Sequence, residues 1–232
     1  MAAPRGRSVR PRRVGRWASE ITAREMGYGA IAGIDEVGMG PLAGPAVAAA
    51  VVLPVGARLP GLNDSKRLSP DQRTAVESRI RKLARAIGIC SVEAADIDRH
   101  GLTWARQRAM RGAVEALSVE ADYLLIDAFD VPDLAIPQLA VIKGDTICAS
   151  IMAASVIAKV FRDQVMTDYD EVYPGYGFSF HKGYGTARHL SALLDLGPCP
   201  IHRLSWGPVG GLHGGPVGDP EIPDPEHSDR RP

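Results

Sequence analysis

The sequence is poor in the residues that stabilise extracellular folds and in segments that could anchor a protein in a membrane. It has only three cysteines, Cys90, Cys148 and Cys199, which lie far apart and form no CxxC pair. They predict neither a disulfide framework nor a zinc site, and a reducing intracellular compartment is the simpler interpretation. The longest apolar run, 42–53, is interrupted by Pro45 and is shorter than the roughly 20 residues that a membrane span requires.

A net charge and a secretory signal are also absent. Lys+Arg 27 balances Asp+Glu 27, and the Arg-rich N-terminus is not followed by the apolar segment of a secretory signal. We therefore expect a cytoplasmic protein without membrane contact. An organelle transit peptide, which is also Arg-rich, remains an open alternative.

The two ends of the chain differ in composition from its middle. Residues 1–24 contain seven Arg and one Glu, whereas residues 208–232 are dense in Gly, Pro and acids. We expect a flexible basic arm over 1–24, one catalytic domain over 25–207 and a disordered tail over 208–232. A basic arm on an acidic body is typical of nucleic-acid enzymes that bind metal, but a solvated tail without function explains the arm equally well.

The hydrophobic pattern of the middle predicts an α/β domain with a mixed sheet. Buried strands are expected at 30–37, 46–53, 87–92, 123–126 and 139–142. Between the first two there is no room for a helix, so we expect an antiparallel hairpin. Helices are expected after Ser69, around 110–117, from Asp145 as the N-cap of a long helix with Ile147 in its buried stripe, and from Thr186 to Gly197.

Four carboxylates stand at or beside the ends of predicted strands. Asp35 and Glu36 close the first strand, Asp127 ends the fourth and Asp145 follows the fifth. Because an unpaired buried carboxylate is costly, we predict that they converge at one edge of the sheet and bind Mg²⁺ or Mn²⁺. The alternative is that Asp127 is a turn residue and Asp145 a helix cap. Since successive strand side chains face opposite ways, Asp35 and Glu36 meet only if the strand ends or bends there.

The loop Gly38-Met39-Gly40 follows the first strand. With Ala43 it matches the form of a dinucleotide-binding motif, but Pro41 does not open a helix, and the two preceding acids would repel a pyrophosphate. Glycines on both sides of Met39 would let the backbone approach the sugar of a polynucleotide. A tight turn without a binding role is the alternative.

Two further segments carry groups suited to phosphate. Ser65 and Lys66 lie in a polar loop that precedes a helix, and Ser155 and Lys159 share one face of the long helix. All four could contact a nucleic-acid backbone. A solvated loop and an ion pair between Lys159 and Asp163 are the alternatives.

A loop over 173–185 mixes Tyr, Phe, Gly, His and Lys. Such a mixture suits stacking on bases or sugars beside phosphate charge. A small aromatic core beneath the loop is the alternative for several of these side chains.

Several motifs in one order resemble the ribonuclease HII family. The resemblance covers most of the middle of the chain, from about Ile31 to Val209. The similar segments are Gly33-Ile-Asp-Glu-Val-Gly38, Leu62-Asn-Asp-Ser-Lys66, Leu125-Ile-Asp127, Lys143-Gly-Asp145, Ala153-Ala-Ser-Val-Ile-Ala-Lys159 and His181-Lys-Gly-Tyr184. Motifs that recur in a fixed order are far more specific than any one of them.

The resemblance implies a ribonuclease H-like fold with a C-terminal helical part. It also implies a metal-dependent endonuclease that cuts the RNA strand of RNA–DNA hybrids and cuts 5′ of ribonucleotides embedded in duplex DNA, leaving a 5′-phosphate and a 3′-hydroxyl. By matching position, the metal ligands are Asp35, Glu36, Asp127 and Asp145. The Gly38–Gly40 loop would sense the 2′-hydroxyl and Tyr184 would pack against the sugar at the RNA–DNA junction. We expect a monomer.

The chain departs from the family pattern at two positions. Met39 stands where the family usually has Arg, and Ala128 stands where it often has Gly. Neither change removes a predicted metal ligand, so we expect activity. A binding module that does not cut, and a two-metal DNA nuclease of the same superfold, are the alternative functions.

Overall fold

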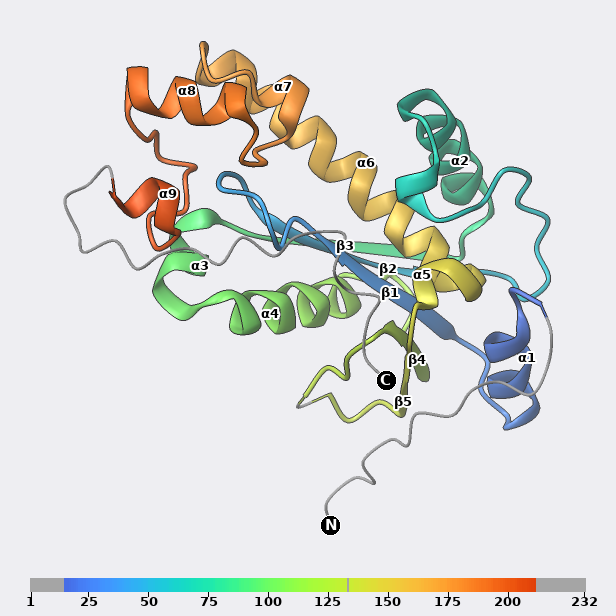
Figure 1. Cartoon of the computed structure of the whole chain (residues 1–232). Coiled ribbons are helices and arrows are strands. Elements are labelled where there is room, and N and C mark those ends of the chain that lie inside the picture. The colour runs from blue at the N-terminus through green and yellow to red at the C-terminus, as the bar shows by residue number, and fades with distance from the viewer. Residues whose placement is uncertain (1–14, 133, 212–232) are drawn as a thin grey trace, which may run out of the picture.

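The computed structural model describes residues 15–132 and 134–211. Within them, five strands form one sheet in the order β3–β2–β1–β4–β5 (Figure 1). The strands are β1 (Ile31–Val37), β2 (Ala46–Val52), β3 (Ala86–Val92), β4 (Tyr123–Asp127) and β5 (Gln138–Val141). β2 runs antiparallel to both of its neighbours, whereas β4 runs parallel to β1 and β5. The predicted mixed sheet and its N-terminal hairpin are confirmed.

Helices cover both faces of the sheet and extend beyond one of its ends (Figure 1). They are α1 (Ala18–Glu25), α2 (Pro70–Leu83), α3 (Ala94–His100), α4 (Leu102–Glu115), α5 (Gly144–Ile147), α6 (Ala149–Val172), α7 (Phe178–His181), α8 (Ala187–Leu196) and α9 (Gly207–Gly210). A short 3₁₀ turn, Ser65–Arg67, precedes α2. In the described part of the chain, no helix is long and apolar enough to cross a membrane.

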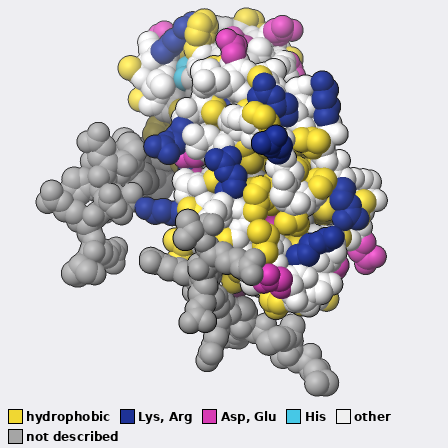
Figure 2. Space-filling view, turned by 90° about the vertical axis from the view of Figure 1, so that its right-hand side faces the viewer, with side chains coloured by type: hydrophobic (Ala, Val, Ile, Leu, Met, Phe, Trp, Pro, Cys, Tyr) yellow, Lys and Arg dark blue, Asp and Glu magenta, His cyan; other side chains and the backbone are white. Residues whose placement is uncertain are grey.

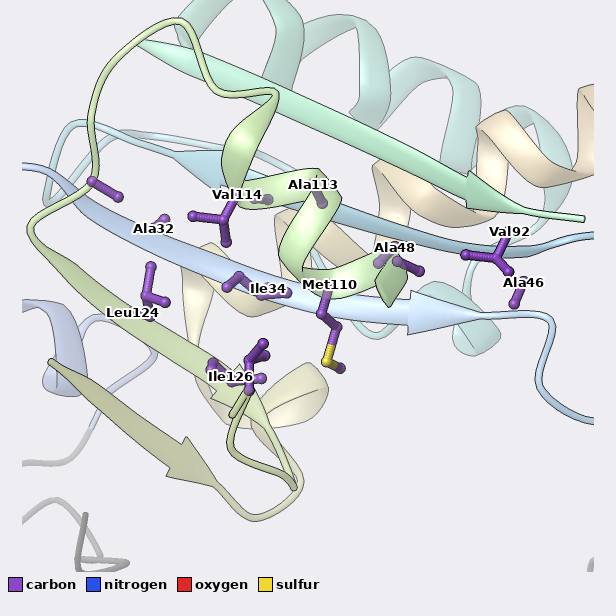
Figure 3. Close-up of a cluster of buried hydrophobic side chains, with 14 of the residues drawn as sticks. Ala32, Ile34, Ala46, Ala48, Val92, Met110, Ala113, Val114, Leu124 and Ile126 are labelled. Atoms are coloured by element: carbon purple, nitrogen blue, oxygen red, sulfur yellow. The ribbon is translucent and has the colours of Figure 1, made fainter. Parts of the chain in front are cut away.

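The alternation of side chains along the strands divides the core into two layers. Ala32 and Ile34 of β1 pack with α4, where Met110 and Val114 lie over β1 and β4 (Figure 3). On the opposite face, α6 packs against β1 and β2, and α2 packs against α6. The two faces of β1 are therefore both buried, which is why its sequence is an almost continuous apolar run rather than an alternating one.

A close approach of α6 to the sheet depends on Gly33. A Cβ at this position would lie 2.1 Å from the carbonyl carbon of Ser150, and 2.5 Å from the amide nitrogen of Ile151, in the backbone of α6. Only glycine lets β1 and α6 pack at this separation. This contact sets the distance between α6 and the residues of β1 that follow Gly33.

The start of the long helix differs from the prediction. Asp145 lies within the separate short helix α5, while Cys148 is the N-cap of α6 and has no side-chain capping bond. The carboxylate of Glu20 supplies the cap, because its Oε1 accepts the Ser150 amide at 2.8 Å and the Ser150 hydroxyl at 2.9 Å. Ile147, expected in the buried stripe, is 46% exposed because the chain turns between α5 and α6.

The expected domain limits also differ from the observed elements. Residues 18–24, assigned above to the arm, form α1, which buries Ala18 and Ala23 and places Glu20 under α6. Residues 208–210, assigned to the tail, belong to α9, in which Val209 is buried. The rest of the predicted arm (1–14) and tail (212–232) lies outside the described residues.

Candidate active site

Two predicted metal ligands lie side by side because β1 and β4 are parallel neighbours. Ile34 pairs with Ile126, so Asp35 and Asp127 follow at the same edge of the sheet. Parallel strands end in the same direction, which brings their last side chains together. The strand order thus brings two of the four predicted ligands to one edge of the sheet.

Asp35 faces α6 and is 6% exposed. Burial raises the pKa of its carboxyl well above the ordinary value, and repulsion from Glu36 and Asp127 raises it further. A hydrogen bond from Ser155 and one from the Glu36 amide at 2.8 Å act in the opposite direction. The folded protein therefore holds a carboxylate here in a position that disfavours its negative charge.

Glu36 projects toward the opposite face of the sheet, on the side of α4. Burial raises the pKa of its carboxyl, Arg106 of α4 opposes that rise, and Asp127 adds to it. Its Oε2 atom is buried and has no hydrogen-bond partner. Asp35 and Glu36 thus point to opposite faces of the sheet, since β1 continues to Val37 without ending between them, although both carboxyls interact electrostatically with Asp127.

The remaining two carboxylates are connected through the turn after β5. Asp127 accepts the Gly144 amide at 2.7 Å, which places α5 beside the end of β4. Burial raises the pKa of the Asp127 carboxyl, and the nearby Asp145 raises it further. Asp145 is 8% exposed and belongs to the same group of charges.

Lys66 approaches this group of carboxylates from the solvent side. Lys66 Nζ lies 3.4 Å from Asp145 Oδ2. The lysine also interacts electrostatically with Asp35, Glu36 and Asp127, and its pKa is raised, since attraction to Asp145 and its neighbours outweighs the opposing effect of burial. Its side chain is 79% exposed, so water and salt weaken this interaction.

The carboxylates fit a divalent cation in their chemistry. Among the residues that the structure describes, no three His, Cys, Asp or Glu side chains already surround a common point closely enough to hold a metal. However, three of the four carboxyls have raised pKa values, and Glu36 has a buried oxygen without a partner. Hard oxygen donors that repel one another are suited to Mg²⁺ or Mn²⁺, which would neutralise them.

The two predicted serine contacts to phosphate have partners inside the protein. Ser65 and Ser155 are 4% and 6% exposed, and their hydroxyl oxygens lie 2.9 Å apart. Ser155 also hydrogen-bonds Asp35. In this structure, therefore, Ser155 bonds Asp35 directly and Ser65 bonds Ser155, so neither hydroxyl faces solvent.

Lys159 forms the ion pair that was the alternative to phosphate contact. Its Nζ lies 2.8 Å from Asp163 Oδ1, while Arg73 of α2 lies 3.7 Å from Asp163 Oδ2. The surface nearby is basic, because residues 58–85 contain eight Lys or Arg and three Asp or Glu. Figure 2 shows Lys and Arg side chains gathered on the side of the molecule that carries α1, α2 and the segment before α2.

The Gly38–Gly40 loop and Tyr184 lie next to each other. A Cβ on Gly40 would lie 4.0 Å from Cε1 of the Tyr184 ring. Tyr184 is 43% exposed, and the Leu42 amide donates to the carbonyl of the neighbouring Gly183 at 2.8 Å. Met39 is partly buried against the α4 side of the core, so its side chain does not reach outward as an arginine would.

Two fully buried arginines, which the sequence analysis did not single out, lie behind this loop and the segment that follows it. Arg162 donates to the carbonyls of Pro45, Ala43 and Lys182. Arg203 donates to those of Gly38, Met39 and Gly44. Arginine is rarely buried, and no local pattern in the sequence reveals that carbonyls from a distant segment will surround it.

Three buried histidines form a second unpredicted group, beneath Tyr184. His189 Nε2 lies 3.0 Å from His202 Nε2, and the ring of His181 stacks on that of His189 with centroids 4.3 Å apart. His189 Nδ1 lies 2.9 Å from the carbonyl oxygen of Tyr184. No regular spacing links these residues in the sequence, so only their common position at Tyr184 connects them.

The geometry agrees with the resemblance noted in the sequence, and comparison with known proteins identifies the family. The family model for ribonuclease HII matches residues 32–209. The chain is 52% identical over 187 residues to a ribonuclease HII of Geotalea uraniireducens, covering 81% of this chain and 87% of that protein. It is 51% identical over 190 residues to that of Geobacter metallireducens, covering 82% and 89%.

A solved structure supports the same assignment. The crystal structure of the ribonuclease H2 from Pyrococcus horikoshii superposes with a TM-score of 0.70 at 25% identity, covering 80% of this chain and 98% of that one. The predicted ribonuclease H-like fold, with its mixed sheet and C-terminal helical part, is thereby confirmed. With matched motifs, half of the aligned residues identical and the same fold, the chain belongs to the ribonuclease HII family.

Proposed function

We propose that the protein is an endonuclease of the ribonuclease H type that cuts RNA in RNA–DNA hybrids. We further propose that it cuts on the 5′ side of single ribonucleotides in duplex DNA, leaving a 5′-phosphate and a 3′-hydroxyl. The observation that supports the proposal is the electrostatic interaction among Asp35, Glu36, Asp127 and Asp145 near one edge of the sheet, beside a loop whose glycines allow a close approach. Membership of the family supports the substrate class.

The four carboxylates would act as the metal ligands. Two bound Mg²⁺ or Mn²⁺ ions would supply an activated water and stabilise the departing 3′-oxygen. Ser155 and the Glu36 amide hold the Asp35 carboxylate in position, and the Gly144 amide holds that of Asp127. These contacts fix the ligands before the substrate arrives, so little reorganisation is needed.

Lys66 would exchange partners during substrate binding. Its ammonium group is at the edge of the carboxylate group and mostly exposed, so a cation that neutralises Asp145 would release it. The freed ammonium could then contact a backbone phosphate, together with Lys159 and the basic surface around α2. The ribonucleotide would contact the Gly38–Gly40 loop and Tyr184, because only RNA offers a 2′-hydroxyl there.

The experiment that tests this function uses one duplex in two versions. The purified chain is incubated with a DNA duplex containing one ribonucleotide, and with the all-DNA duplex, in Mg²⁺, in Mn²⁺ and in chelator. We expect metal-dependent cutting directly 5′ of the ribonucleotide and no cutting of all-DNA. Binding without cutting in either metal would refute the nuclease and favour a binding module, while cutting of all-DNA would favour another nuclease of the superfold.

An active-site variant provides the control for that assay. Asp35→Asn keeps the size of the side chain and removes its charge, so we expect folded protein without cleavage. Full activity of this variant would refute the role of Asp35. Size-exclusion chromatography with light scattering tests the expected monomer, and microscopy of a fluorescent fusion tests the expected cytoplasmic location.

A further inference from the structure

Arg203, which is 0% exposed, forms hydrogen bonds to the buried side of the Gly38–Gly40 loop. Nη2 of this arginine donates to the Gly38 carbonyl at 2.5 Å, and Nη1 donates to the Met39 carbonyl at 2.9 Å. Nε and Nη2 also donate to the Gly44 carbonyl, at 3.2 and 2.9 Å. One planar guanidinium thus fixes three carbonyls of the loop in a single arrangement.

These contacts determine where the amides of the loop point. The peptide bonds are trans, so the N–H of each residue points opposite to the carbonyl of the residue before it. With the carbonyls of Gly38 and Met39 directed at Arg203, the amides of Met39 and Gly40 are directed away from it. Within the described residues, neither amide has an acceptor in the protein, and Gly40 is exposed beside Tyr184.

Backbone hydrogen bonds also connect the segment around Arg203 to the residues that follow the loop. The Arg203 amide donates to the Leu42 carbonyl at 2.8 Å, the Gly44 amide donates to the Ile201 carbonyl at 2.8 Å, and Ala43 forms an antiparallel bridge with His202. The guanidinium has no ion-pair partner among the described residues, and burial lowers its pKa to about 9. The nearby Arg162 lowers this pKa further and Asp98 opposes the change, but every hydrogen bond of the guanidinium goes to a backbone carbonyl.

We propose that Arg203 is a positioning residue for ribonucleotide recognition, which turns the free amides of Met39 and Gly40 toward the 2′-oxygen of the substrate. The inference rests on the proposed function and deepens it. It also explains how the loop tolerates Met39, since recognition by backbone amides needs the correct orientation of the peptide planes and not a particular side chain at that position. Arg203 itself does not touch the substrate.

A matched pair of variants tests the proposal. Arg203→Lys keeps the charge but replaces the planar fork with a compact ammonium, whose three donors leave one atom and cannot reproduce the separate positions of Nε, Nη1 and Nη2. Arg162→Lys is the control, because Arg162 is equally buried and also donates to three carbonyls, none of them from Gly38 or Met39. Thermal unfolding checks that both variants are folded.

The decisive measurement is how well each variant discriminates the ribonucleotide duplex from the all-DNA duplex, and not its activity alone. KM is measured for the duplex with one ribonucleotide, and Ki is measured for the all-DNA duplex of the same sequence as a competitor. For Arg203→Lys we expect the ratio Ki/KM to fall about tenfold, as for the loss of one hydrogen bond to the 2′-oxygen. For Arg162→Lys we expect an unchanged ratio.

The outcomes separate this inference from the proposed function. If the wild type cuts the ribonucleotide duplex and the ratio is unchanged in Arg203→Lys, the inference is wrong while the function stands. An equal fall in both variants would also refute it, because any disturbance of the loop would then suffice. Failure of the wild type to cut would refute the proposed function, and the inference with it.

A measurement on the wild type covers the case in which Arg203→Lys does not fold. Hydrogen exchange of the Met39 and Gly40 amides is followed by NMR in chelator, with each duplex in turn. We expect the ribonucleotide duplex to slow the exchange of both amides more than the all-DNA duplex does. Equal protection by the two duplexes, or none, would overturn the proposal.

Discussion

Acidification is expected to destabilise the C-terminal helical part through one pair of buried imidazoles. His189 and His202 are 0% and 2% exposed, and burial lowers the pKa of each from 6.5 to about 4. The Tyr184 carbonyl can only accept, so His189 Nδ1 carries a proton and His189 Nε2 accepts from His202 Nε2. His202 Nδ1 in turn accepts the Cys199 amide at 2.9 Å. Both rings are therefore neutral, and protonating either one places two N–H groups face to face.

The sign of the effect follows from the lowered pKa. Above pH 6.5 both imidazoles are neutral in the folded and the unfolded chain, so their contribution is fully present. As the pH falls toward 4, the unfolded chain takes up protons that the folded protein does not, and stability decreases. Between pH 7.5 and 5.5 each ring costs about 1 kcal/mol, and because neither ring is protonated in the folded protein over this range we expect about 2–3 kcal/mol for the pair.

Urea unfolding followed by circular dichroism, in chelator at the two pH values, measures this difference. The control is the double variant His189→Asn with His202→Asn, whose amides replace the bonds to the Tyr184 carbonyl and the Cys199 amide but do not titrate. The raised pKa values of Asp35, Glu36 and Asp127 act in the opposite direction in both proteins and cancel in the comparison. If the wild type and the double variant lose the same stability on acidification, the assignment of neutral rings is refuted.

Three further changes have expected outcomes. Asp35→Asn should raise the free energy of unfolding in chelator by about 0.5–2 kcal/mol while abolishing cleavage, because the wild-type carboxylate is buried against other acids; a lower urea midpoint in the variant would contradict this. Gly33→Ala should destabilise the protein by about 3 kcal/mol or more, since its Cβ would overlap the α6 backbone; an unchanged melting temperature would show that α6 can shift freely. Ala128→Gly should stabilise by about 0.5–1 kcal/mol, because Ala128 has φ +59°, where a Cβ is strained; a loss of stability measured by urea unfolding would refute that reasoning.

The sequence by itself predicted the five strands, the N-terminal hairpin and the longer helices, and it named the carboxylates that we propose as metal ligands. Apolar runs that end in carboxylates located β1 and β4 with Asp35 and Asp127, and Ser69 with Gln72 correctly marked the start of α2. Thr186 likewise caps α8, which ends before Gly197. These signals are local, since each depends on residues a few positions apart whose propensities and hydrogen bonds act within one element.

Only the tertiary structure decided how distant segments complete these elements. The long helix begins with a cap from Glu20 and not from Asp145, and Ser65 and Ser155 support Asp35 instead of facing solvent. Arg203, 165 positions away from Gly38, orients the loop after β1. The physical reason is the same in each case: a buried polar group must find a partner, and the nearest one in space is set by how the layers pack. The sequence names the groups that need partners, while the fold determines which partners they meet.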